Sequence, residues 1–151
     1  MAVLKTPVDN TLVTASALDS ILGTIATREF DYAQITVDAT SNATSAATAT
    51  AVITGGSVIY DGATIVLVDF QCICQSGAGA MDLELYDNAT DLGLIGQLQA
   101  SSTVLLRGSE RLTPTAGAHV YSLRVWNGTA VTATIKATPP TLPAYLRVSR
   151  V

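Results

Sequence analysis

The chain has 151 residues, a formal net charge of −4 and a sequence pI near 4.6. Only 13% of its residues are charged, against roughly 25% in an average soluble domain, and 48% are hydrophobic. This length favours a single domain, and an acidic chain with singly scattered Lys and Arg excludes a typical nucleic-acid-binding protein. A surface with so few charges is typical of subunits that contact other subunits.

The first 27 residues are predicted to form an arm that precedes the folded domain. Residues 1–15 contain Pro7, show no hydrophobic periodicity and lack the apolar stretch of a secretory signal. We therefore expect the protein to be made in a cytoplasm. Residues 17–25 favour a short helix, with a strand as the competing interpretation. Their apolar positions at helical spacing are Leu18, Ile21, Leu22 and Ile25.

The domain that follows is predicted to span residues 28–151, and its first strand begins in the loosely alternating segment 30–37. The tract 38–50 is rich in Ala and Thr. This composition fits either a flexible loop or a strand packed closely against another subunit, and it leaves both open. Glycine-containing pairs at 55–56 and 61–62 predict turns on either side of a short strand at 57–60.

The strongest strand prediction covers residues 63–75. One face would carry Val66, Val68, Phe70, Cys72 and Cys74, and the other Ile65, Leu67, Asp69, Gln71 and Ile73. The first face is apolar and predicted to lie in the core, whereas the mixed face is expected to be partly covered by another surface. We interpret the two cysteines as small buried apolar residues, because zinc would need further ligands and a disulfide within one strand would strain its backbone.

The middle of the chain continues with short strands. Residues 81–86 alternate, with Met81, Leu83 and Leu85 directed inward. A loop or hairpin is predicted at 86–93, and a strand at 92–99. A further strand at 102–107 is expected to be broken by Gly108-Ser109.

The last third of the chain is predicted to close the sheets. A strand at 119–126 is followed by Asn127-Gly128, which suits a tight type I′ hairpin leading into a strand at 131–135. Prolines at 139, 140 and 143 exclude sheet there, and residues 145–150 form the final strand. Eight to ten short strands separated by turns predict an all-β antiparallel jelly-roll sandwich.

Four strings of this sequence together resemble a known family. They are YDGATIVLVDFQC, DLELYDNATDLGLIG, RLTPTAGAHVYSLRVW and PAYLRVSRV, within residues 57–151. The resemblance is to jelly-roll modules of phage virion proteins, which are similar in fold to trimeric tumour-necrosis-factor-like and complement-type globular domains. It implies a three-fold homotrimer held by apolar and aromatic faces. It also implies a place among head decoration proteins or fibre components.

We therefore expect a trimeric capsid decoration, or cement, protein on the outer surface of a virion head. Its partners would be its own copies and the major capsid protein of the same particle, with no nucleic acid and no membrane. The alternative is a head- or tail-fibre component whose jelly roll binds a host surface glycan. A soluble cytokine-like or lectin-like ligand is disfavoured by the missing signal peptide.

Two sets of contact residues follow from this hypothesis. The arm residues expected to contact the capsid are Val3, Leu4, Val8, Leu12 and Val13. The residues expected at the trimer interface are Ile65, Leu67, Ile73, Tyr121 and Trp126.

No catalytic residue, cofactor or metal site is predicted. His119 is the only histidine and has no motif around it, so a solvent-facing or hydrogen-bonded role is favoured over a general base. Asp82 and Glu84 share one strand face and are interpreted as solvated charges. Trp126 and Tyr145 could stack on a sugar, but aromatic residues are more often core or interface anchors.

Overall fold

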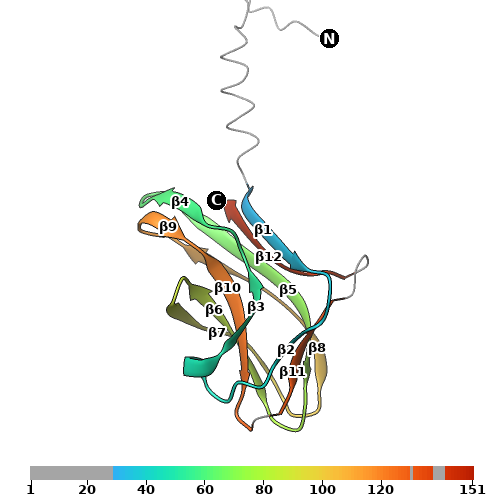
Figure 1. Ribbon diagram of the computed structural model, residues 1–151. Coiled ribbons are helices and arrows are strands. Elements are labelled where there is room, and N and C mark those ends of the chain that lie inside the picture. The colour runs from blue at the N-terminus through green and yellow to red at the C-terminus, as the bar shows by residue number, and fades with distance from the viewer. Residues whose placement is uncertain (1–28, 130, 138–141) are drawn as a thin grey trace, which may run out of the picture.

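The computed structural model describes residues 29–129, 131–137 and 142–151. Within these ranges the protein is built from twelve β-strands and a single turn of 3₁₀ helix, η1 (Ala46–Thr48). Figure 1 shows the strands packed as a sandwich, with β3 and β10 toward the viewer. The predicted arm and the helix at 17–25 lie outside the described residues.

The larger sheet has six strands arranged around one long central strand, β5 (Val66–Ser76). On one side β5 pairs with β8 (Thr103–Leu112) along nearly its whole length. On its other side β5 pairs first with β12 (Ala144–Arg150) and then with β11 (Ala133–Lys136). The outer strands are β1 (Glu29–Ile35) beside β12 and β2 (Ala39–Ser41) beside β11.

The second sheet has four strands in the order β3, β10, β6 and β7. Their bounds are β3 (Thr50–Thr54), β10 (Tyr121–Asn127), β6 (Met81–Asp87) and β7 (Thr90–Leu98). A short ribbon of β4 (Val58–Asp61) and β9 (Ala116–His119) adjoins them. The chain passes repeatedly from one sheet to the other and every pairing is antiparallel, which confirms the predicted all-β jelly-roll sandwich.

The core lies between the two sheets and follows the alternation of the strands. The five apolar residues predicted on the inner face of β5 are all buried. Met81, Leu83 and Leu85 of β6 are buried opposite them, as predicted. Each fully buried Leu contributes about 1.5–3 kcal/mol to folding through its removal from water. Cys72 and Cys74 belong to this core, and their sulfur atoms lie 3.3 Å apart as free thiols.

The predicted break at Gly108-Ser109 is wrong, because β8 continues through both residues. A side chain at position 108 would place its Cβ 2.6 Å from Cζ of Phe70 on the paired strand. Glycine therefore makes room for the buried Phe70 ring. Gly108 thus serves the packing of Phe70 and does not interrupt β8.

The predicted tight hairpin at Asn127-Gly128 is also wrong, because β10 and β11 belong to different sheets. The Asn127 side chain is fully buried, and its amide donates hydrogen bonds to the Gly79 carbonyl (3.0 Å) and to Ser76 Oγ (3.3 Å). Asn127 thus joins two loops at one end of the sandwich. The tight two-residue turn instead joins β6 to β7, where Asn88 has a positive φ of 55°.

Two other segments differ in detail from their predictions. The Ala/Thr tract 38–50 contains β2, η1 and the first residue of β3, so it is neither a plain loop nor one strand. The predicted strand 119–126 is divided at Val120, whose backbone N–H and carbonyl both bond to Asn88. This division directs His119 into the β4–β9 ribbon and Tyr121 into the second sheet.

None of the helical segments in the described ranges has the length and apolar character needed to cross a bilayer.

Replacement of Gly108 by Ala should destabilise the fold by about 1–3 kcal/mol, because the new methyl group overlaps the Phe70 ring. Urea unfolding measures this loss. Ser109→Ala, at the exposed neighbouring position, should change stability by no more than about 0.5 kcal/mol. Combining Gly108→Ala with Phe70→Leu should cost less than the sum of the two single changes. If the loss in the double variant equals the sum of the two single losses, the Phe70 ring is not the reason that glycine occupies position 108.

Candidate functional site

The outward face of the six-stranded sheet is a flat surface that mixes aromatic, apolar and paired charged groups. The Tyr32 ring stacks on Tyr145, with ring centroids 5.7 Å apart and an interplanar angle of 26°. Beside them, Arg147 Nη2 lies 2.9 Å from Asp69 Oδ2. This hydrogen-bonded ion pair raises the pKa of Arg147. The face therefore carries large side chains whose positions are fixed before any partner arrives.

Two polar groups on this face show how closely it is packed. Gln71 is buried, and its Nε2 donates to the Pro143 carbonyl at 3.2 Å. Arg147 Nε is buried yet has no hydrogen-bond partner among the described residues. A buried donor without an acceptor costs about 1–3 kcal/mol, so close packing of this face leaves one polar group unsatisfied.

A second surface is the free edge formed by β7 and β8. Among the described strands, β7 pairs only with β6 and β8 only with β5. The two edge strands touch, since a Cβ at Gly96 of β7 would lie 2.6 Å from Leu106 of β8. Four large apolar side chains on these strands are partly exposed: Leu92 (42%), Leu94 (56%), Val104 (43%) and Leu105 (40%). An apolar, unpaired edge of this kind is normally covered in a stable protein.

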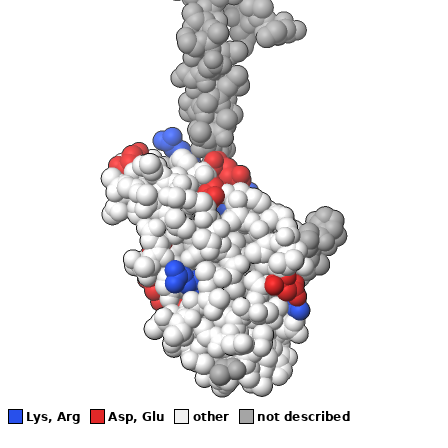
Figure 2. Space-filling view, in the orientation of Figure 1, with Lys and Arg blue, Asp and Glu red and all other residues white. Residues whose placement is uncertain are grey.

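Sequence reasoning did not single out these four edge residues or Tyr32. The available signal was the run Val104-Leu105-Leu106, in which consecutive apolar residues point to opposite faces of one strand. Since only one face of β8 can meet the core, the other apolar side chains had to be exposed or covered by a partner. Figure 2 shows a mostly uncharged face on which the charged groups lie in a few small clusters.

The structure disperses the predicted trimer-interface residues. Leu67 and Ile73 are half-buried on the mixed face of β5, and Ile65 lies directly before that strand. Tyr121 is only 2% exposed and packs inside the protomer, so it has almost no surface left for a partner. Trp126 lies on the other sheet. The predicted capsid contacts Val3, Leu4, Val8, Leu12 and Val13 lie outside the described residues.

Trp126 belongs to a hydrogen-bonded cluster on the outward face of the four-stranded sheet. Its Nε1 donates to Glu84 Oε1 at 2.8 Å, and the Tyr86 hydroxyl lies 3.3 Å from Glu84 Oε2. The Arg124 guanidinium covers the Tyr86 ring, 4.1 Å from its centroid. Glu84 is only 6% exposed, so it is not the solvated carboxylate that was predicted. Tyr145 lies on the other sheet, so it and Trp126 cannot form one sugar platform.

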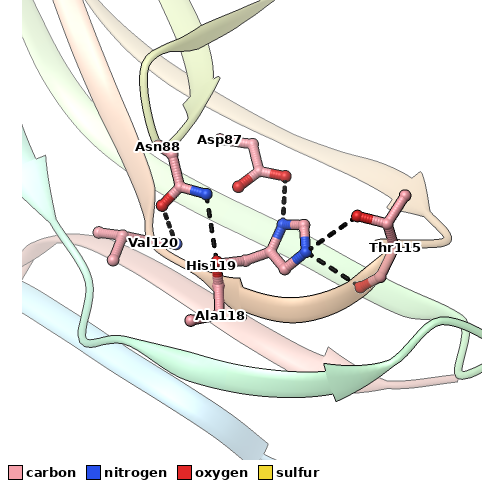
Figure 3. Close-up of polar contacts among 6 residues, drawn as sticks. All are labelled: Asp87, Asn88, Thr115, Ala118, His119 and Val120. Atoms are coloured by element: carbon pink, nitrogen blue, oxygen red, sulfur yellow. Dashed lines mark hydrogen bonds and ion pairs between the residues drawn. The ribbon is translucent and has the colours of Figure 1, made fainter.

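His119 occupies a polar cluster at the β4–β9 end of the sandwich, drawn in Figure 3. Its Nδ1 lies 2.6 Å from Asp87 Oδ2, and its Nε2 lies 3.0 Å from the Thr115 carbonyl. Asn88 fixes the adjoining backbone, because its side chain bonds to both Ala118 and Val120. The histidine is therefore hydrogen-bonded, which is one of the two roles that the sequence favoured, and it is buried instead of solvent-facing.

The same cluster superficially resembles a nucleophile paired with a base, because Thr115 Oγ1 lies 3.4 Å from His119 Nε2. The Thr115 carbonyl is the nearer of the two contacts to Nε2, at 3.0 Å, and it competes with the hydroxyl for this ring nitrogen. The arrangement orients the loop that carries Thr115.

The neighbouring Tyr60 ring meets His119 edge to face, with centroids 5.6 Å apart. Burial, with smaller contributions from the Asp31 and Asp87 charges, raises the pKa of Tyr60 to about 12. This hydroxyl thus stays protonated over the ordinary pH range. In the described part of the chain, no three His, Cys, Asp or Glu side chains are grouped so as to hold a metal ion.

Comparisons with known proteins do not assign this chain to a family. No family model matches the chain, and no curated protein matches it. Among solved structures, the chain is similar to a carbohydrate-binding module CBM36 in complex with calcium and xylotriose, at 11% identity and a TM-score of 0.42. That match covers 66% of this chain and 76% of that chain.

A second similar structure is the C-terminal CBM6 of LamC, a marine laminarinase from Zobellia galactanivorans, at 11% identity and a TM-score of 0.31. The match covers 68% of this chain and 76% of that chain. Similarities this distant do not indicate a shared function.

Replacement of His119 by Ala should destabilise the protein by about 2–4 kcal/mol, because the partly buried Asp87 carboxylate loses its partner. Thermal or urea unfolding checks this value. Thr115→Ala is the matched control: it keeps the carbonyl that accepts from Nε2 and should stay within about 0.5 kcal/mol of the natural protein. A large loss in the control would mean that the threonine hydroxyl, and not the carbonyl, holds the ring.

Proposed function

We propose that this protein is a homotrimeric structural module of a virus particle, a decoration protein that binds the coat on the outer surface of the head. The observation that carries the proposal is the pair of unequal surfaces on one protomer. One is the apolar β7–β8 edge with Leu94 and Leu105, and the other is the flat face with Tyr32 and Tyr145. Both are suited to burial against another protein.

The two surfaces differ in composition, and we propose that the edge of one copy binds the face of the next. Contact between an edge on one copy and a face on the next is heterologous, and such a contact gives a closed ring when the rotation between copies closes and an open filament when it does not. The family resemblance implies a ring of three copies. A stable interface buries about 800 Å² per partner, and the partly exposed leucines would supply its apolar centre.

Attachment to the coat is assigned to the arm, whose apolar residues Val3, Leu4, Val8, Leu12 and Val13 have no place in the predicted strands. Three arms on one trimer would bind the major capsid protein at several points at once. Multivalent binding can exceed the affinity of a single arm by roughly 10²–10⁴-fold. The trimer would thereby bridge coat subunits and resist the pressure of the packaged genome.

The alternative is a head- or tail-fibre component of the same fold. It differs from a decoration protein in needing a surface that binds a host glycan, and in occurring in few copies per particle. The outward face around Trp126 is the specific feature that keeps this alternative in view.

Leu105→Asp and Leu94→Asp should each raise the trimer dissociation constant by about 100-fold or more, because a charge would be buried in an apolar contact. Light scattering across a dilution series measures the mass, and circular dichroism shows whether the variants stay folded. Val37→Asp, at a 74% exposed position in the turn after β1, is the control and should remain trimeric. A natural protein that is monomeric at every concentration would contradict the trimer.

Deletion of residues 2–15 should leave a folded trimer that no longer attaches to particles. The measurement is the amount of protein that co-sediments with heads emptied of their genome, together with the melting temperature of those heads. The full chain should add at saturating stoichiometry and raise that temperature. Normal decoration by the truncated chain would show that attachment does not depend on the arm, and binding to host cells instead of heads would favour the fibre alternative.

A further inference from the structure

The indole of Trp126 is held in a fixed orientation on an outward sheet face. Its N–H is donated to Glu84, and the ring itself remains partly exposed. An indole whose single polar group is already bonded presents only apolar ring surface to anything that approaches. Such a ring can pack against C–H groups but contributes no further hydrogen bond.

Planar polar side chains lie directly beside this ring. Asp82 of β6 is the register partner of Trp126, and its Oδ1 accepts a hydrogen bond from Gln97 Nε2 of β7 at 2.8 Å. This contact leaves Asp82 Oδ2, Gln97 Oε1 and the second amide hydrogen of Gln97 with no side-chain partner in the described part of the chain. Both donors and acceptors are therefore available next to an apolar ring.

The support beneath the ring is rigid. Glu84 is a nearly buried carboxylate on a face where Tyr86 and Ser122 are also buried, which is costly unless its oxygens are bonded. Trp126 donates to Glu84 Oε1, and the one hydroxyl hydrogen of Tyr86 is shared between Glu84 Oε2 (3.3 Å) and the carbonyl of Ala46 in η1 (3.0 Å). The ring, the sheet and the η1 turn are thus joined, so little ordering would be needed when a ligand binds.

These features together match the chemistry of a sugar. A pyranose has a C–H face that packs on an aromatic ring and hydroxyl groups that donate to a carboxylate and exchange bonds with an amide. We infer that this surface binds a neutral hexose unit of a glycan, with Trp126 as the stacking ring and with Asp82 and Gln97 bonding to hydroxyls. An anionic sugar is disfavoured because two carboxylates, Asp82 and Glu84, face a single nearby guanidinium, that of Arg124.

The Trp126 surface shares β7 with the proposed trimer edge, since Gln97 and Leu94 both belong to that strand and Leu94 is the register partner of Glu84. The trimer is nevertheless measured by its mass, and the sugar site by Trp126 emission and calorimetry. The two proposals can therefore fail separately. A decoration protein with this site would also hold particles near glycan-coated surfaces, and a fibre component would use the same site to bind its host.

The test uses the full chain and a panel of neutral oligosaccharides built from glucose, galactose, mannose and N-acetylglucosamine. The chain has one tryptophan, so its selectively excited emission reports Trp126 alone. At least one oligosaccharide should change this emission saturably and bind by calorimetry. Trp126→Ala should weaken calorimetric binding by about 10-fold or more, which corresponds to at least about 1.4 kcal/mol.

Trp126→Ala also removes the hydrogen-bond donor of Glu84 Oε1, so this variant changes stability as well as binding. Two milder variants separate binding from folding. Gln97→Ala and Asp82→Asn leave the Trp126–Glu84 bond intact and should each weaken binding by about 3-fold or more. Gln75→Ala, an exposed glutamine on the other sheet, is the matched control and should bind normally. Absence of saturable binding by the intact chain would overturn the inference. Unchanged affinity in all three site variants would do the same, leaving the cluster as a support for the η1 turn.

Discussion

The whole structure depends on one strand, β5, which pairs with β8 on one side and with both β12 and β11 on the other. Its inner residues form the centre of the core, and its outer residues form the centre of the flat face that we assign to assembly. A one-residue change in its register would exchange these two sets of side chains. One face of β5 therefore stabilises the core, and the other face forms the centre of the proposed partner surface.

Two buried polar groups hold the loops that this strand cannot reach. Asn127 joins the loops at one end of the sandwich through Ser76 and Gly79, and His119 joins Asp87 to Thr115 at the other. Both side chains satisfy backbone or carboxylate groups that would otherwise be buried without partners. The sandwich is therefore fixed at both ends by directional bonds, while its middle is held by packing. Asn127 and His119, which suggest a turn and a possible general base in the sequence, therefore stabilise loops in the structure.

Strand alternation was sufficient to predict the architecture, since the inner face of β5 and the closing strand β12 have strong period-two patterns. Alternation and turn signals were insufficient at Gly108 and at Asn127-Gly128. Gly108 leaves room for the Phe70 ring within a continuous strand, and Asn127 bonds to a loop that is distant in the sequence. Strand alternation predicted only part of the candidate surfaces. Leu67 and Ile73 follow from alternation, whereas the exposed edge of β7 and β8 depends on which strands end a sheet, and that is decided by long-range pairing.

The cysteine pair has a consequence for the surroundings in which the module can work. The hydrogen bond that the Cys74 thiol shares with Cys72, together with burial, raises the pKa of Cys74, so the reactive thiolate form is suppressed. Both sulfur atoms are also shielded from dissolved oxidants by the two sheets. We expect the domain to tolerate transfer from a reducing to an oxidising medium without forming a bridge, acquiring an adduct or needing a protective reductant.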